Sequence, residues 1–150
     1  MMSDIWNKYL TQLPPLEGGA HDEGSGSLCA MEMVAYMERL PHSDSPECTC
    51  PVLASYVRTL NDNMNDEQRQ KLLPILPMLV GTVNDDLVVQ RAEFFAQAAN
   101  ERFVPMCGES PDKVWDESIQ VLVEAIELDP ERVVAQWSAG VAEKLIEEFS

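Results

Sequence analysis

The fold class is decided by residues 110–149, which read SPDKVWDESIQVLVEAIELDPERVVAQWSAGVAEKLIEEF. Ser110 and Asp129 each stand directly before a proline, an order that is typical of a helix N-cap followed by the first helical residue. Behind each start, apolar residues recur every three or four positions, as they do on one face of a helix. The stretch therefore predicts two helices, 111–127 and 130–148, and the tight turn between them predicts an antiparallel hairpin.

The same signals continue toward the N-terminus. Capping residues, helical periodicity and terminating prolines or glycines predict five further helices, at 3–12, 27–39, 51–60, 66–79 and 85–103. A loop rich in Gly, Ser and acidic residues fills 17–27, and no segment shows the alternation of a strand. We therefore expect an all-α fold, a compact single-domain bundle of six to seven helices over residues 1–150, with its helical body at 27–149.

Charge limits the partners that the chain can bind. Lys and Arg total 10 and Asp and Glu total 26, which gives a formal net charge of −16. Such a chain repels phosphate backbones and anionic lipid surfaces, so we expect no direct nucleic-acid binding and no membrane binding, and a protein partner with a basic surface is favoured. The N-terminal MMSDIWNKYL does not resemble a signal peptide, so we expect a cytoplasmic protein with reduced thiols. The oligomeric state stays open.

Three cysteines and a histidine define a candidate metal site. Cys29 lies at a predicted helix start, and His42, Cys48 and Cys50 share one loop. Zinc prefers thiolate and imidazole ligands in a tetrahedron, but the single residue between Cys48 and Cys50 departs from the spacing of zinc fingers. The alternative is that Cys29 and Cys48 are small buried apolar residues. We expect no stoichiometric metal, and zinc is the cofactor that the residue types would allow.

A thiol at a helix start is also a candidate nucleophile. The N-terminus of a helix lowers the pKa of a nearby thiol, so Cys29 would carry more thiolate there. His21 or His42 would then act as the base, oriented by Asp22 or Asp44. No family-specific signature surrounds these residues, and both histidines fall in loops, where a surface role is common.

Four further polar residues are candidates for a buried network, namely Glu32, Asn61, Asp62 and Arg91. Glu32 stands among apolar neighbours, and Arg91 lies on a predicted helix between apolar positions. A buried carboxylate paired with an arginine would lock helices into one arrangement, which is the structural interpretation. The functional alternative is an acid–base pair or a metal site.

The C-terminal helices carry many carboxylates, of which Asp112, Asp116, Glu124 and Glu127 are the candidate partner-binding residues. A solvated helix face would explain them, since exposed charges keep a protein dispersed in water. The functional hypothesis is a phosphate-like array that occupies a basic nucleic-acid site on another protein.

Several motifs occur in order over residues 26–81, namely CAMEMVAYM, HSDSPEC, PVLASYVRTLND and LLPILPMLVG, and VVQRAEFFAQAA extends the pattern. The chain thereby resembles a group of small uncharacterised proteins from phage and bacterial genomes. The group has no established activity, so the resemblance implies a lineage and a phage context but no mechanism. Its members typically have histidine at the position of Ser45 and often lack a cysteine at Cys50.

The leading hypothesis from the sequence is therefore a non-enzymatic acidic interaction protein of phage context, an inhibitor or nucleic-acid mimic that engages a basic surface of a partner protein. The alternative is a small zinc-binding or cysteine-dependent enzyme centred on Cys29, His42 and Cys48. No phosphate-binding loop, paired-histidine helix motif or nucleophile elbow is present in the sequence.

Overall fold

The computed structural model describes residues 15–19, 28–38 and 40–129. Within these ranges the regular elements are helices and no strand occurs, which confirms the all-α prediction for this part of the chain. The described helices group into five segments, fewer than the six or seven expected for the whole chain. Two predicted helices, 3–12 and 130–148, lie outside the described residues, as does the predicted loop beyond residue 19.

Some of the five segments combine different helix types. A 3-10 stretch lies within the third segment, and the fourth contains both 3-10 and π turns. In chain order the elements are α2 (Ala30–Met37), α3 (Pro51–Asn63), α4 (Asp66–Arg69) with η2 (Gln70–Ile75) and α5 (Leu76–Leu79), then η3 (Asp85–Leu87) with α6 (Val88–Ala98), η4 (Ala99–Phe103) and η5 (Val104–Met106), and finally α7 (Pro111–Ile126).

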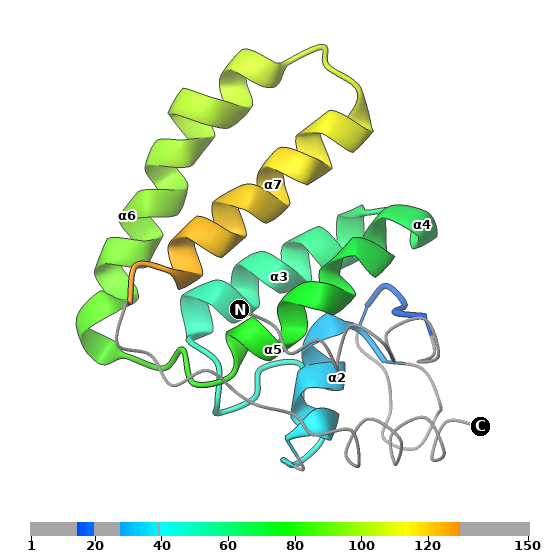
Figure 1. Ribbon diagram of the computed structural model, residues 1–150, viewed down its shortest axis with the longest axis vertical. Helices are drawn as coiled ribbons and strands as arrows, with labels where there is room; N and C mark the ends of the chain where they lie inside the picture. Colours follow the sequence, from blue (N-terminus) through cyan, green and yellow to red (C-terminus); the bar gives the residue numbers. More distant parts are fainter. Residues whose placement is uncertain (1–14, 20–27, 39, 130–150) are drawn as a thin grey trace.

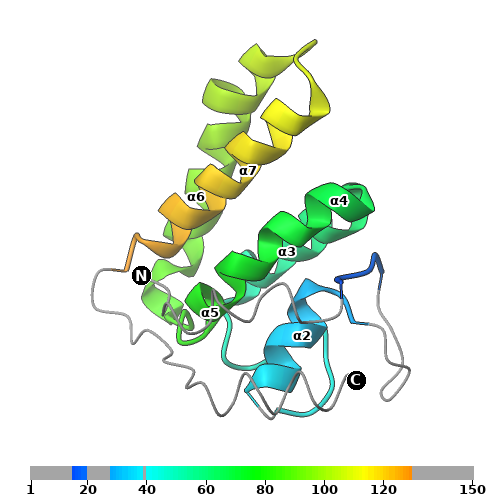
Figure 2. The ribbon, with the colours of Figure 1, turned by 45° about the vertical axis from the view of Figure 1, so that its right-hand side comes forward.

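α6 and α7 lie side by side as an antiparallel pair that stands out from the other helices (Figures 1 and 2). α3 packs against both of them, and α2 packs against α3 and α5. The predicted hairpin of 111–127 with 130–148 extends beyond the described residues. Within those residues, the antiparallel neighbour of α7 is α6, so the hairpin connection runs through η4, η5 and Gly108, whose φ of 93° needs a residue without a Cβ.

Two predicted helix starts are confirmed in atomic detail. Ser110 is the N-cap of α7, and its hydroxyl oxygen accepts a hydrogen bond from the Lys113 N–H (3.5 Å). Asn65 caps α4, where its Oδ1 accepts from the Gln68 N–H (2.8 Å) and the Gln68 side chain accepts from the Asn65 N–H (3.3 Å). This reciprocal capping box explains why a helix begins at Asp66 within a strongly polar stretch.

The prolines of the predicted helix 66–79 change its geometry instead of ending it. Pro74 lies inside the 3-10 stretch η2, and Pro77 lies in the first turn of α5. A proline has no N–H to donate to the preceding turn, so a regular α-helix cannot continue through Pro74. The tighter 3-10 turns carry the chain past it, and Leu72 and Leu76 remain fully buried on one side.

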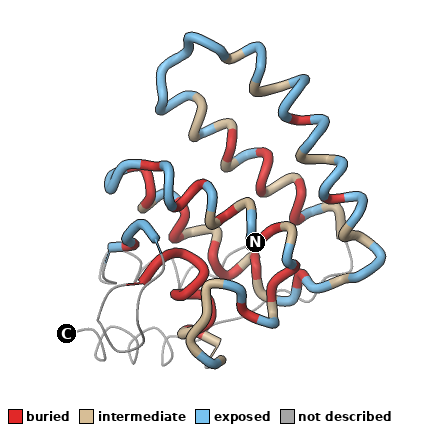
Figure 3. Tube along the Cα trace, turned by 180° about the vertical axis from the view of Figure 1, so that it is seen from behind, coloured by how far each residue is buried: buried red, intermediate tan, exposed pale blue. Residues whose placement is uncertain are grey.

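The core lies where α2, α3, the third segment and the inner side of α7 meet. Its largest fully buried apolar side chains are Leu16, Met31, Met33, Leu53, Leu72, Leu76, Leu79, Leu122 and Ile126. Figure 3 shows buried positions gathered in this body, whereas most of α6 and the far end of the α6–α7 pair are exposed. Among the described residues, no helix is both long and apolar enough to span a bilayer.

Candidate functional site

The start of α2 is held by buried polar side chains. Glu32 Oε1 accepts a hydrogen bond from the Cys29 N–H (2.9 Å), and Asn61 Oδ1 accepts one from the Ala30 N–H (3.1 Å). The other Glu32 oxygen lies 3.3 Å from His42 Nε2. Glu32 is 2% exposed and Asn61 is fully buried. The two side chains therefore satisfy N–H groups that the first turn of a helix leaves without partners inside the helix.

The same corner fixes the described loop 15–19. Asn61 Nδ2 donates to the Glu17 carbonyl (2.9 Å), and Asp62 Oδ1 accepts from the Gly19 N–H (2.8 Å). Of the four residues predicted to form a buried polar network, Glu32 and Asn61 are buried where α2, α3 and this loop meet, and Asp62 lies beside Asn61 but is exposed. Their bonds go mainly to backbone groups, which is the pattern of a structural joint.

Arg91, the fourth predicted member, lies elsewhere and makes other bonds. Its guanidinium is fully buried and donates to the carbonyls of Thr82 (2.7 Å), Ala125 (3.1 Å) and Ile126 (3.4 Å). The last two carbonyls belong to the final turn of α7, where the helix dipole places partial negative charge. Arg91 therefore ties α6 to the C-terminus of α7 through carbonyl groups, and these three hydrogen bonds do not involve Glu32.

Arg69 has a similar role that we did not predict from the sequence. It is only 6% exposed, and it donates from Nε to the Asn61 carbonyl (2.6 Å) and from Nη2 to the Met64 carbonyl (2.6 Å). These carbonyls lie at the end of α3. The sequence contains one signal for this, because Arg69 stands at helical spacing with the apolar Leu72 and Leu76.

The environment of Cys29 opposes a thiolate. The side chain is 3% exposed, and desolvation by burial raises the pKa of the thiol to about 12. Glu32 raises it further through its negative charge, and backbone N–H groups lower it only in part. The thiol is therefore protonated near pH 7, although a helix start would by itself favour the thiolate. His42 lies beside Glu32, and His21 and Asp22 are outside the described residues.

The predicted metal ligands Cys29, His42, Cys48 and Cys50 all fall within the described residues. In this part of the chain, no group of three or more His, Cys, Asp or Glu side chains is placed to hold a metal ion. Cys50 is fully buried at the start of α3, where its N–H donates to Thr82 Oγ1 (2.9 Å). Cys48 Sγ lies 3.7 Å from Thr49 Oγ1. Of the two cysteines that the structural alternative expects to be buried, Cys29 is buried and Cys48 is only half-buried.

The four candidate partner-binding carboxylates, called here the acidic face, are Asp112, Asp116 and Glu124 on one side of α7 and Glu127 at its C-cap; Lys113 lies on the same side. At about 100° per residue they span about 120° of the helix, on the side opposite the buried residues Val121 and Ala125. Asp112, Asp116 and Glu127 are exposed, and the Glu124 side chain is 40% exposed. The face is therefore open to a partner.

Three members of the acidic face have polar partners within the chain. Gln68 Nε2 donates to Asp112 (2.6 Å), Lys71 Nζ pairs with Asp116 (2.8 Å), and Arg102 pairs with Glu124 (2.8 Å) as well as with Glu117. The pKa of the Glu124 carboxyl is lowered, chiefly by its hydrogen bond to Arg102. The Glu124 carboxyl is therefore ionised at neutral pH, and the contacts of the face anchor α7 to the third and fourth segments.

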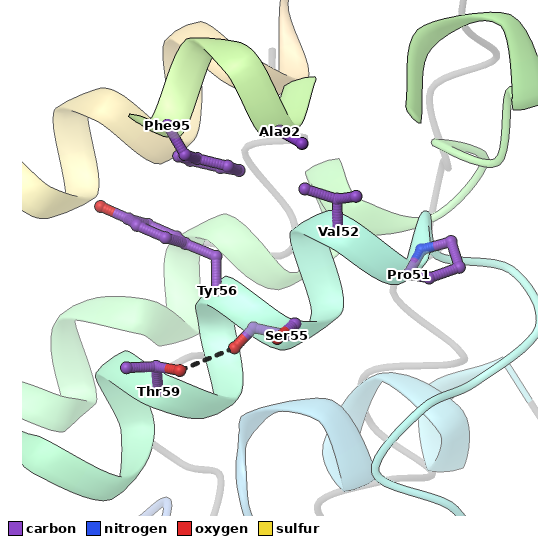
Figure 4. Close-up of a pocket in the computed structure, with 7 residues that line it drawn as sticks. All are labelled: Pro51, Val52, Ser55, Tyr56, Thr59, Ala92 and Phe95. Atoms are coloured by element: carbon purple, nitrogen blue, oxygen red, sulfur yellow. Dashed lines mark hydrogen bonds between the residues drawn. The ribbon is translucent and has the colours of Figure 1, made fainter. Parts of the chain in front are cut away.

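An apolar groove lies between α3 and α6 (Figure 4). The Tyr56 and Phe95 rings stack with their centroids 4.2 Å apart, and Tyr56 OH donates to the Ser118 carbonyl (2.8 Å). The open space has a volume of about 480 Å³, and its lining residues, called here the α3–α6 groove, are Pro51, Val52, Ser55, Tyr56, Thr59, Ala92 and Phe95. Nothing in the sequence analysis predicted it, because it depends on the angle between two helices.

Comparison of the chain with protein-family models, with curated proteins and with solved structures finds no match.

Proposed function

We propose that this is a non-enzymatic acidic interaction protein whose acidic face engages a basic surface of a partner protein. The observation that carries the proposal is that the basic side chains are already paired within the chain. Every described Lys and Arg is already engaged by a carboxylate or a carbonyl of the chain, namely Arg58, Arg69, Lys71, Arg91, Arg102 and Lys113. Exposed carboxylates therefore dominate the field that an approaching molecule meets, which favours basic partners.

The contacts within the acidic face do not oppose this function. Asp116 is 63% exposed and Lys71 is 41% exposed, so their ion pair is screened by water and contributes little to stability. A partner's arginine can therefore replace Lys71 at little cost in stability. An arginine binds a carboxylate or a phosphate through the same planar fork of donors. This chemistry, with the resemblance to phage proteins, supports an inhibitor that occupies a nucleic-acid site.

The enzyme alternative has less support. Burial keeps the Cys29 thiol protonated, and the described cysteines and histidine do not gather around a common point. The acidic interaction protein is the function that the described geometry supports best.

Affinity capture from a lysate of the source cells tests the proposal. The bait is compared with a face variant in which Asp112 and Asp116 become Asn and Glu124 and Glu127 become Gln. A matched control neutralises four exposed carboxylates elsewhere: Glu47, Glu67, Asp85 and Glu101. The two variants change the net charge equally, so only the position of the charges differs.

The expected result is one protein that the wild type and the control capture and that the face variant loses. Double-stranded DNA should release it, because both ligands would compete for one basic site. Capture by the face variant at the wild-type level would contradict a role for the acidic face.

A further inference from the structure

The α3–α6 groove leaves apolar surface uncovered on the described residues. Val52 and Ala92 face one another across it, and the Tyr56–Phe95 pair bridges the two helices (Figure 4). Its volume of about 480 Å³ falls in the range of surface sites that hold ligands. On the α6 side the apolar surface continues past the groove, because Val89 is 67% exposed. The groove is therefore part of a larger apolar strip.

The outward side of α6 lets another backbone approach closely. Ala92, Ala96 and Ala99 are exposed at spacings of four and three residues, so they follow one another along this side of the segment. Small side chains allow helix axes to come near one another, as at many helix–helix contacts. The strip therefore fits an elongated occupant that lies along α6.

The hydrogen-bonding groups of the groove indicate which backbone conformation a bound peptide must have. α3 and α6 use their backbone groups within their own helices, and the Thr59 hydroxyl donates to the Ser55 carbonyl (3.0 Å). The walls thus offer no row of free N–H and C=O groups with which an extended peptide could pair. An occupant must satisfy its own backbone while it presents apolar side chains, and an amphipathic helix does both.

The charge around the groove indicates which charge the polar side of the bound helix should carry. Neither Lys nor Arg lines the groove. Glu93 is exposed directly after Ala92, and Asp86 is exposed just before α6. Arg102 lies close enough to Tyr56 to act on it electrostatically, but Glu117, which also acts on Tyr56, pairs with Arg102 and offsets its charge. Arg58 on α3 already donates to the Asp44 carbonyl (3.0 Å). The rim is therefore acidic, and its charge is complementary to lysines and arginines flanking an apolar helix face.

From these observations we infer that the α3–α6 groove binds a basic amphipathic helix of a partner protein, with the apolar side of that helix against Val52, Ala92 and Phe95. The inference rests on the proposed function in one respect, namely that the partner is basic. It concerns a surface different from the acidic face of α7, so the two can fail separately.

A defined probe tests this binding. It is a labelled synthetic peptide of leucine and lysine whose leucines repeat at helical spacing, and fluorescence anisotropy measures its dissociation constant with the full chain. Two peptides serve as comparisons: one with glutamate in place of lysine, and one with the same basic composition in a scrambled order. Only the basic amphipathic peptide should bind, and its affinity should fall with added salt.

Matched variants locate the site. Ala92→Trp fills the groove without a change of charge, and Gln90→Trp places the same ring on α6 about 160° away around the helix axis. Both positions are exposed, so neither substitution disturbs the core. Ala92→Trp should weaken the peptide at least 10-fold and Gln90→Trp less than 2-fold. Ser55→Trp blocks the groove from α3 and should repeat the first result if Ala92→Trp fails to fold.

Other results would overturn the inference. Absence of binding, or equal binding to the Ala92→Trp and Gln90→Trp variants, removes the groove as the site. Binding lost in the acidic-face variant of α7 but kept in Ala92→Trp would place the peptide on that face, which supports the proposed function and rejects the groove. A dimer that sedimentation detects and Ala92→Trp dissociates would identify a second copy as the occupant.

Discussion

Replacing Arg91 with methionine should cost more stability than any change at a partly exposed arginine. Methionine keeps much of the side-chain volume but none of the donors, so the carbonyls of Thr82, Ala125 and Ile126 lose their shared partner. The guanidinium is fully buried, so water cannot replace it without rearrangement. Loss of one partner from a buried polar cluster of this kind costs about 3–5 kcal/mol. For a chain of this size that corresponds to roughly 10 °C in melting temperature.

Urea unfolding followed by helical circular dichroism measures this loss. Arg58→Met is the matched control, because Arg58 is partly exposed and donates to the Asp44 carbonyl (3.0 Å). That variant should lose about 1 kcal/mol or less. If Arg91→Met unfolded at the same urea concentration as Arg58→Met, the assignment of Arg91 as the tie between α6 and the end of α7 would be wrong.

Four further predictions concern the joint, the thiols and the acidic face. Asn61→Ala should lower the free energy of unfolding by about 2 kcal/mol, because it leaves the buried Ala30 N–H without an acceptor. Alanine at the exposed Asn63 should lower it by less than about 1 kcal/mol, and equal losses in urea titrations would argue against the joint. Alkylation at pH 7, mapped by mass spectrometry, should modify Cys107 quickly and Cys29 only on unfolding; fast labelling of Cys29 would restore the nucleophile hypothesis. Burial raises the pKa of Cys29 from 9.0 to about 12, so the thiol of the unfolded chain ionises at a lower pH than that of the folded chain. The free energy of unfolding should therefore fall as the pH rises above 9, and Cys29→Ala should reduce this fall between pH 9 and 10. Lys71→Met should leave the urea midpoint of unfolding close to that of the wild type, because water screens this exposed ion pair; a clear fall in the midpoint would mean that the acidic face is structural.

Local sequence signals predicted the helices well where a few neighbouring residues decide the structure. Ser110 before Pro111, and Asn65 three residues before Gln68, are complete within one turn, and both caps form. The start of α2 shows the limit of such signals. The sequence predicted a helix from residue 27, but α2 begins at Ala30, because Glu32 and the distant Asn61 supply acceptors to its first N–H groups.

Tertiary features escaped the sequence because they depend on how helices are oriented. The predicted partner of a buried arginine was a carboxylate, yet Arg91 bonds to carbonyls at the end of α7, and no local pattern reveals that those carbonyls point toward it. The α3–α6 groove exists because Tyr56 and Phe95 hold the two helices at a particular separation. The acidic face was predictable, since 3.6-residue periodicity alone places its carboxylates opposite the buried side of α7.

The central claim is that carboxylates of α7 steer this protein to a basic partner. The most direct test is the association rate constant with the captured partner, measured by stopped-flow fluorescence as ionic strength rises. Electrostatic steering predicts a fall of at least 10-fold between about 20 mM and 500 mM salt. It also predicts a lower rate at low salt for the variant neutralised at Asp112, Asp116, Glu124 and Glu127 than for the matched charge control. A rate that does not change with salt, and is equal in the two variants, would contradict the account.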